Sequence, residues 1–195
     1  MGQKPQKDEN TDKKTAVLTV HLHTSHWDFF VPASGQTKKE AFECVRYVLE
    51  KATQNHLQII LGEDTNHKPS SHHQLDKSET HPLSYKGIQG FSPYIIKSTG
   101  RDLFISPFLQ PYIESNNIAS LVMIGYNINV CVEETIRGAK KMGLNVLTCP
   151  QILFGSSGFR ENSSVTKRTL NAYQHDDAIT TYPTVEELVE KEFIQ

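Results

Sequence analysis

The sequence predicts an α/β fold of three layers, in which helices cover both faces of a mostly parallel, six-stranded sheet of Rossmann-like topology. Short apolar runs alternate along the chain with longer segments of helical periodicity, a pattern typical of parallel sheets. Several of these runs are apolar at nearly every position, as expected for strands that are buried on both faces. The length of 195 residues fits one domain.

Six strands are expected from the apolar runs, at residues 16–22, 57–62, 93–97, 119–125, 144–149 and 178–182. Helices are expected at 38–54, from Ser106 and Pro107 onward, at 130–142, at 159–173 and after Thr184. Thr37 with Glu40, and Thr184 with Glu187, have the spacing of capping boxes. Pro111 is placed in the second turn of its helix, which it should bend or loosen.

The ends and the composition limit the class of protein. Residues 1–14 are polar and are expected to be a disordered tail before a single domain at 15–195. A net charge of -2 gives no case for a nucleic-acid partner, and no apolar run reaches the roughly 20 residues that span a bilayer. Three cysteines without paired spacing favour a reducing compartment, and so a cytoplasmic protein.

The candidate site lies where the strands end, because ligands of open parallel sheets bind beyond the carboxyl ends of the strands. Cys131 follows an apolar strand and falls in the first turn of a helix, where free N–H groups and the helix dipole favour a thiolate. Lys97 ends another strand and supplies a positive charge. The competing interpretation is that Cys131 is a small buried residue that packs the helix onto the sheet. Cys44 and Cys149 are expected to be structural.

The segment LVMIGYNINVCVEETIRGAKKMGLNVLTCP, residues 121–150, resembles the nucleophile segment of the isochorismatase-like cysteine hydrolases. The matching positions are Gly125, Cys131, Val132, Glu133, Thr135, Ala139 and Gly143, and the resemblance extends over residues 15–192. It implies an Asp–Lys–Cys triad, of which Lys97 and Cys131 match two members. It also implies a cis peptide at Tyr126–Asn127, with the backbone N–H groups of Asn127 and Cys131 forming an oxyanion hole.

The third member of the triad departs from the family pattern. The segment VLTVHLH places His21 where the family has its aspartate, and His23 where it has a glutamine. A histidine can accept the proton of a thiol near neutral pH, so Cys131 and His21 form a workable nucleophile and base. Alternatively, loss of the carboxylate beside Lys97 leaves a positive pocket that holds a thiolate but moves protons poorly.

A long polar insertion at 63–92 contains four of the nine histidines. One branch of the family binds a divalent metal through Asp-x-His and a later histidine, whereas this chain has Asp64 and His67 spaced Asp-x-x-His, with His81 downstream. These three are weak candidates for zinc ligands, and the main expectation is a protein without a cofactor.

The sequence therefore predicts a hydrolase that acts on a small amide or ester through Cys131 as the nucleophile, with a weakened or altered activity because of the departure at His21. The resemblance also implies a small-molecule substrate and a homo-oligomeric assembly. The first alternative is a catalytically inactive member that serves as a binding or interaction module. A second alternative is redox sensing by Cys131, with Cys149 as its resolving partner.

Overall fold

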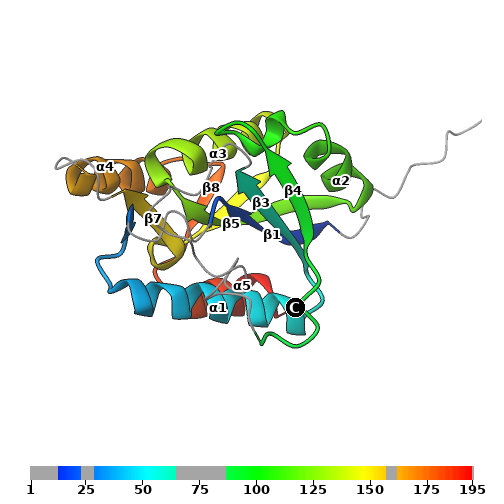
Figure 1. Cartoon of the computed structure of the whole chain (residues 1–195), viewed down its shortest axis with the longest axis horizontal. Helices are drawn as coiled ribbons and strands as arrows, with labels where there is room; N and C mark the ends of the chain where they lie inside the picture. The colour runs from blue at the N-terminus through cyan, green and yellow to red at the C-terminus, as the bar shows by residue number, and fades with distance from the viewer. Residues whose placement is uncertain (1–12, 23–28, 65–86, 157–161, 195) are drawn as a thin grey trace, which may run out of the picture.

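A computed structural model describes residues 13–22, 29–64, 87–156 and 162–194 (Figure 1). These residues form one eight-stranded sheet covered by helices on both faces. Figure 1 shows α1 (Lys38–Gln54) and α5 (Val185–Glu192) below the sheet, and α2 (Leu109–Ser115), α3 (Glu133–Lys141) and α4 (Asn162–Gln174) above it. The three predicted layers are therefore present.

The sheet is built around β1 (Lys14–Val20), which pairs in parallel with β3 (Gln58–Asp64) on one side and β5 (Ile118–Tyr126) on the other. β3 pairs with β4 (Tyr94–Ser98), which ends the sheet on that side. On its other side β5 pairs first with β6 (Asn145–Thr148) and, at its end, with β7 (Leu153–Ser156). β6 pairs with β8 (Ile179–Thr181), and β7 pairs antiparallel with β2 (Phe30–Pro32).

The mostly parallel sheet is confirmed, but the predicted count of six strands was wrong, because the described residues contain eight. The two additional strands are β2 and β7, which have three and four residues and contain Pro32 and Gly155. Runs this short carry no readable period, and both residue types are depleted in strands. A 3-10 turn at Pro150–Ile152 separates β6 from β7, so two short strands occupy one side of β5.

Local sequence signals set the start of α1 and α5. Helix α1 has the predicted bounds, and the Thr37 hydroxyl accepts a hydrogen bond from the Glu40 N–H at 3.3 Å while the Thr37 N–H donates to the Glu40 carboxylate at 2.8 Å. Helix α5 has the Thr184 half of its predicted box, a 3.2 Å bond from the Glu187 N–H. These bonds satisfy backbone donors that a helix leaves open at its start.

Two helix predictions need correction. The helix expected from Ser106 begins only at Leu109, after a 3-10 turn at Leu103–Ile105, so Pro111 lies in the first turn. A proline there removes no helical hydrogen bond, and α2 is not disrupted by it. The helix expected at 130–142 is divided into a π-helical turn at Ile128–Val132 and α3, and Gly143 follows it with φ +73°.

Two apolar layers, one on each face of the sheet, form the core. The layer under α1 and α5 includes Val17, Val45, Leu49, Ile124 and Leu188, and the layer under α2, α3 and α4 includes Leu18, Ile60, Met123, Val132 and Ile136. Within the described residues, no helix has both the length and the apolar character needed to cross a membrane. Of the predicted tail, residues 1–12 lie outside the described residues, and Lys14 already belongs to β1.

Candidate active site

The carboxyl ends of the four neighbouring strands β5, β1, β3 and β4 lie at one level. The register pairs Val20 of β1 with Gly62 of β3 and Gly125 of β5, and it pairs Glu63 with Lys97. Each next residue therefore falls in one row across the sheet, in the order Tyr126, His21, Glu63 and Lys97. Neighbours in this row are about 4.8 Å apart along the hydrogen-bonding direction. The row places Glu63 between the two predicted site residues His21 and Lys97.

His21 directly follows β1 and is almost fully buried, with 2% of its surface exposed. Its backbone N–H donates to the Gly62 carbonyl at 3.0 Å, which extends the pairing of β1 with β3 by one residue. Its φ of +49° lies in the left-handed region, which is sparsely populated by residues other than glycine. The chain thus turns away from the strand direction at His21, the residue that the sequence prediction aligns with the family aspartate.

Lys97 is exposed and lies near the end of β4, the outer strand of the sheet. The next residue, Ser98, is buried, and its hydroxyl accepts a hydrogen bond from the Gly100 N–H at 3.2 Å. This bond sets the direction in which the chain leaves β4. The lysine ammonium is therefore attached to a fixed strand end and retains access to solvent.

Cys131 lies in the π-helical turn Ile128–Val132 and is half-buried. The turn starts at Asn127, whose carbonyl accepts from the N–H groups of Val130 at 2.9 Å and Val132 at 3.1 Å. The Asn127 side chain also accepts from the Asn129 N–H at 3.1 Å. The peptide bond between Tyr126 and Asn127 is cis, as the resemblance implies. Asn127 thus organises the turn through its side chain and carbonyl.

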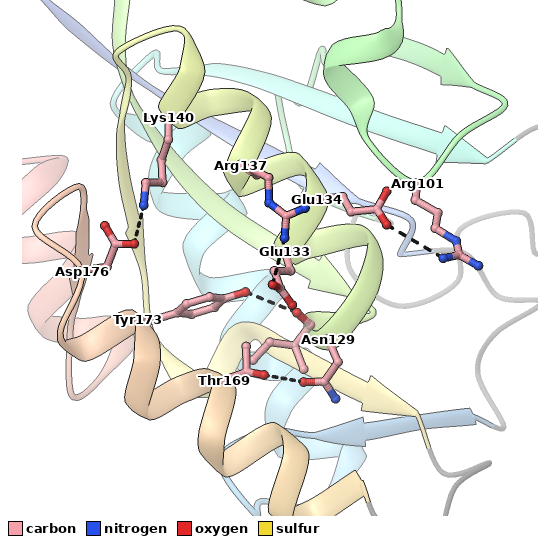
Figure 2. Close-up of polar contacts among 10 residues, drawn as sticks. Arg101, Asn129, Glu133, Glu134, Arg137, Lys140, Thr169, Tyr173 and Asp176 are labelled. Atoms are coloured by element: carbon pink, nitrogen blue, oxygen red, sulfur yellow. Dashed lines mark hydrogen bonds and ion pairs between the residues drawn. The ribbon is translucent and has the colours of Figure 1, made fainter.

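Helix α4 holds this turn through three polar contacts, two of which appear in Figure 2. The Thr169 hydroxyl donates to the Asn129 side-chain oxygen at 2.8 Å, as Figure 2 shows. The Asn129 amide donates to the Thr166 hydroxyl at 3.3 Å. The buried Tyr173 hydroxyl donates to the Ile128 carbonyl at 3.3 Å. We call Thr166, Thr169 and Tyr173 the α4 clamp. Because both Ile128 and Asn129 are held, the clamp restrains the backbone that carries Cys131.

A second set of contacts joins α3 to the chain that leaves β4. The buried Thr135 hydroxyl accepts from the Leu103 N–H at 3.2 Å and donates to the Arg101 carbonyl at 3.4 Å. At Gly138 a side chain would meet Phe104 at 2.7 Å, so the glycine permits a close approach of the two segments. The strand that carries Lys97 and the helix that follows Cys131 are thereby fixed relative to each other.

The other two cysteines lie in surroundings that disfavour a thiolate. Burial raises the pKa of the Cys149 thiol to about 12, and the residue has no exposed surface. Burial also raises the pKa of Cys44, which is half-buried on α1. Since the thiolate is the reactive form of cysteine, both residues suit structural roles, as the sequence predicts.

The structure describes only part of the candidate metal site, which comprises Asp64, His67 and His81. His67 and His81 lie outside the described residues, and of Asp64 only its place as the last residue of β3 is described. Among the residues whose side chains the structure describes, no group of three or more histidine, cysteine, aspartate or glutamate side chains could hold a metal ion.

Comparison with known proteins identifies the fold. Neither a protein-family model nor a curated protein matches the chain. Solved structures do match, among them a putative isochorismatase from Burkholderia xenovorans, with a TM-score of 0.72 at 13% identity over 92% of this chain and 88% of that one. The chain has the isochorismatase-like hydrolase fold.

Other solved structures with this fold differ in the activity by which they are described. Nicotinamidase PncA from Bacillus subtilis matches with a TM-score of 0.64 at 14% identity, over 86% of this chain and 98% of that one. MAR1 ribonuclease from Caenorhabditis elegans matches with a TM-score of 0.66 at 15% identity, over 91% of this chain and 80% of that one. Identities this low support the shared fold and leave the reaction of this chain to its own residues.

Within the isochorismatase-like fold, the sequence prediction missed two residues near the expected site. Thr135 was recognised only as part of a motif, whereas its hydrogen bonds give it a tethering role. Glu63 falls at the start of the predicted insertion at 63–92, whereas it belongs to β3, and its position between His21 and Lys97 follows from strand register. A paired register of this kind has no signature in a single sequence.

Proposed function

We propose that this protein is a cysteine hydrolase of the isochorismatase-like superfamily that cleaves a small amide or ester, with Cys131 as the nucleophile. The observation that carries the proposal is the location of Cys131. It is a half-buried thiol in a clamped turn at the start of α3, just beyond the carboxyl end of β5. Parallel sheets bind their ligands at this edge, and a thiol there has access to a bound substrate.

The reaction uses Cys131, His21 and Lys97 in separate roles. The Cys131 sulfur attacks the carbonyl carbon, and the thiol proton passes to the His21 imidazole. The C–N or C–O bond of the substrate then breaks, and the leaving group takes that proton from His21. Water, deprotonated by His21, cleaves the thioester and regenerates the thiol. Lys97 favours the thiolate by its charge, and the N–H groups of Asn127 and Cys131 stabilise the oxyanion.

A second candidate is a non-catalytic protein that uses the same edge to bind a ligand or partner. The conformation of His21 favours it, because this residue replaces the family aspartate and turns away from the strand direction. The two candidates differ in what they require of Cys131. A catalyst needs a thiol that is ionised near neutral pH, whereas a binding module does not.

The deciding experiment measures the rate of Cys131 alkylation by iodoacetamide against pH, followed by mass spectrometry of the Cys131 peptide. Wild type is compared with His21→Ala and Lys97→Ala, and Cys44 and Cys149 serve as internal controls because burial raises both of their pKa values. A thiolate pKa below the ordinary value of about 8.5 that rises in both variants supports the hydrolase.

A Cys131 pKa near the ordinary value that neither substitution changes would eliminate the hydrolase and favour the binding module. If the thiol is activated, a substrate screen follows with small amides and esters. RNA oligonucleotides belong in that screen because of the likeness to MAR1 ribonuclease. Product formation that disappears in Cys131→Ala identifies the reaction.

A further inference from the structure

The described strand ends contain one carboxylate between the two charged or ionisable groups of the candidate site. We propose that Glu63 is a positioning residue that holds the His21 imidazole in place as the base for Cys131. This inference rests on the proposed function, since it concerns the proton acceptor in that reaction. It assigns the role of orienting the base to β3, a strand that carries none of the expected catalytic residues.

Strand register places Glu63 beside both partners. The pairing of Glu63 with Lys97 puts their side chains on the same face of the sheet, because directly paired residues of neighbouring strands share a face. On the other side, Val20 pairs with Gly62, and the His21 N–H donates to the Gly62 carbonyl at 3.0 Å. The backbones of His21 and Glu63 are therefore neighbours at a strand spacing of about 4.8 Å.

Burial favours a polar partner for the histidine. His21 is 2% exposed and Glu63 is half-buried. When His21 accepts the thiol proton it becomes a buried cation, which is costly unless an anion or a hydrogen-bond acceptor lies nearby. The Glu63 carboxylate is an anion attached to the adjacent strand at the same level. Its side chain has the length to reach across one strand spacing.

In a Cys–His–Glu arrangement, every proton that is transferred has a donor and an acceptor. One imidazole nitrogen takes the proton of the Cys131 thiol and later gives it to the leaving group. The other nitrogen carries a hydrogen and donates it to Glu63, which fixes the tautomer and the ring orientation. Glu63 accepts this hydrogen bond and neither gains nor loses a proton in the cycle.

A simpler role for Glu63 gives the opposite result on substitution. If the carboxylate only offsets the charge of Lys97, its removal leaves a more positive site, and the Cys131 thiolate becomes more stable. If it supports His21, its removal destabilises the imidazolium that forms with the thiolate, and the thiolate becomes less stable. The sign of the change in Cys131 reactivity therefore separates the two roles.

The test compares Cys131 alkylation at pH 6 in the full-length wild type and in Glu63→Gln, with the full pH profile for each. We expect Glu63→Gln to slow alkylation by about tenfold, which corresponds to one pKa unit. Glu63→Asp, which keeps the carboxylate, should restore most of the loss. In a His21→Ala background, Glu63→Gln should have no further slowing effect.

Glu50→Gln is the matched control, because the substitution removes the same charge at a different place in the fold. Glu50 lies on α1 and forms an ion pair with Arg46 at 2.7 Å. It should leave the alkylation rate unchanged. Thermal midpoints of all variants show whether each remains folded. A faster or unchanged rate in Glu63→Gln overturns the inference while an activated wild-type Cys131 still supports the hydrolase. An ordinary wild-type pKa refutes both together.

Discussion

The α4 clamp predicts that a substitution on α4 changes the reactivity of Cys131 without touching it. Thr169→Val keeps the shape of the side chain and removes the hydroxyl that donates to Asn129 at 2.8 Å. Loss of one such hydrogen bond costs about 1 kcal/mol. In a chain of this length that cost lowers the thermal midpoint by roughly 2–4 °C. If the full cost of about 1 kcal/mol is added to the activation free energy of alkylation because the turn is less well oriented, alkylation of Cys131 slows by about fivefold.

A matched control lies at the opposite end of α3. Lys140 forms an ion pair with Asp176 beyond the last turn of α4, as Figure 2 shows. Lys140→Met removes this pair far from the π-helical turn. We expect it to lower stability by about 0.5 kcal/mol, as partly exposed pairs do, and to leave the alkylation rate unchanged. Alkylation rates and melting curves are measured on the same samples. Equal rates for Thr169→Val and wild type, despite a lower midpoint, would refute a positioning role for the clamp.

Three further predictions follow from burial and close packing. The pKa of Asp102 is raised, mainly by burial, so its ionised form is disfavoured in the folded protein. Asp102→Asn should therefore unfold at a higher urea concentration than wild type at pH 7. The difference in urea midpoint should disappear below about pH 4, where the carboxyl of the wild type is protonated in both states. Gly125→Ala should lower the free energy of unfolding by about 3 kcal/mol or more, because the added Cβ would lie 2.4 Å from the Val20 carbonyl oxygen. Gly143→Ala has open space around its Cβ and should cost about 1 kcal/mol, and calorimetry measures both changes. Cys149, with a pKa of about 12, should resist alkylation at pH 8 until urea unfolds the protein, and equal rates in both states would contradict its burial.

Much of the fold could be predicted because its signals are local. The bounds of α1 follow from the Thr37–Glu40 capping box and from the spacing of its apolar residues. Both signals come from residues within one or two helical turns of each other. The π-helical turn at Cys131 could not be predicted in this way. Its polar partners on α4 lie 37 to 45 residues further along the chain, so the conformation of the turn depends on tertiary packing.

The candidate site likewise has a part that can be predicted from local sequence signals and a part that cannot. Cys131 and Lys97 can be predicted as site residues from the rule that parallel sheets place their sites at strand ends, and that rule needs only the element order. The neighbours of a strand-end residue depend on register, which a single sequence does not contain. Glu63 is therefore visible as a partner of Lys97 only after the strands are aligned. The left-handed conformation of His21 likewise has no signal in a histidine between two apolar residues.

The hydrogen bonds of Thr135 change what its match to the nucleophile segment of the isochorismatase-like hydrolases signifies. This threonine and Gly138 seat α3 against the segment from Arg101 to Phe104, and neither contact involves the thiol. Selection for a helix that docks correctly would preserve both residues in a chain that no longer catalyses anything. In this chain, a match at Thr135 therefore reports how α3 is anchored and carries no information on the reactivity of the thiol. The activity of this chain has to be tested at the row of residues that ends the neighbouring strands, Tyr126, His21, Glu63 and Lys97.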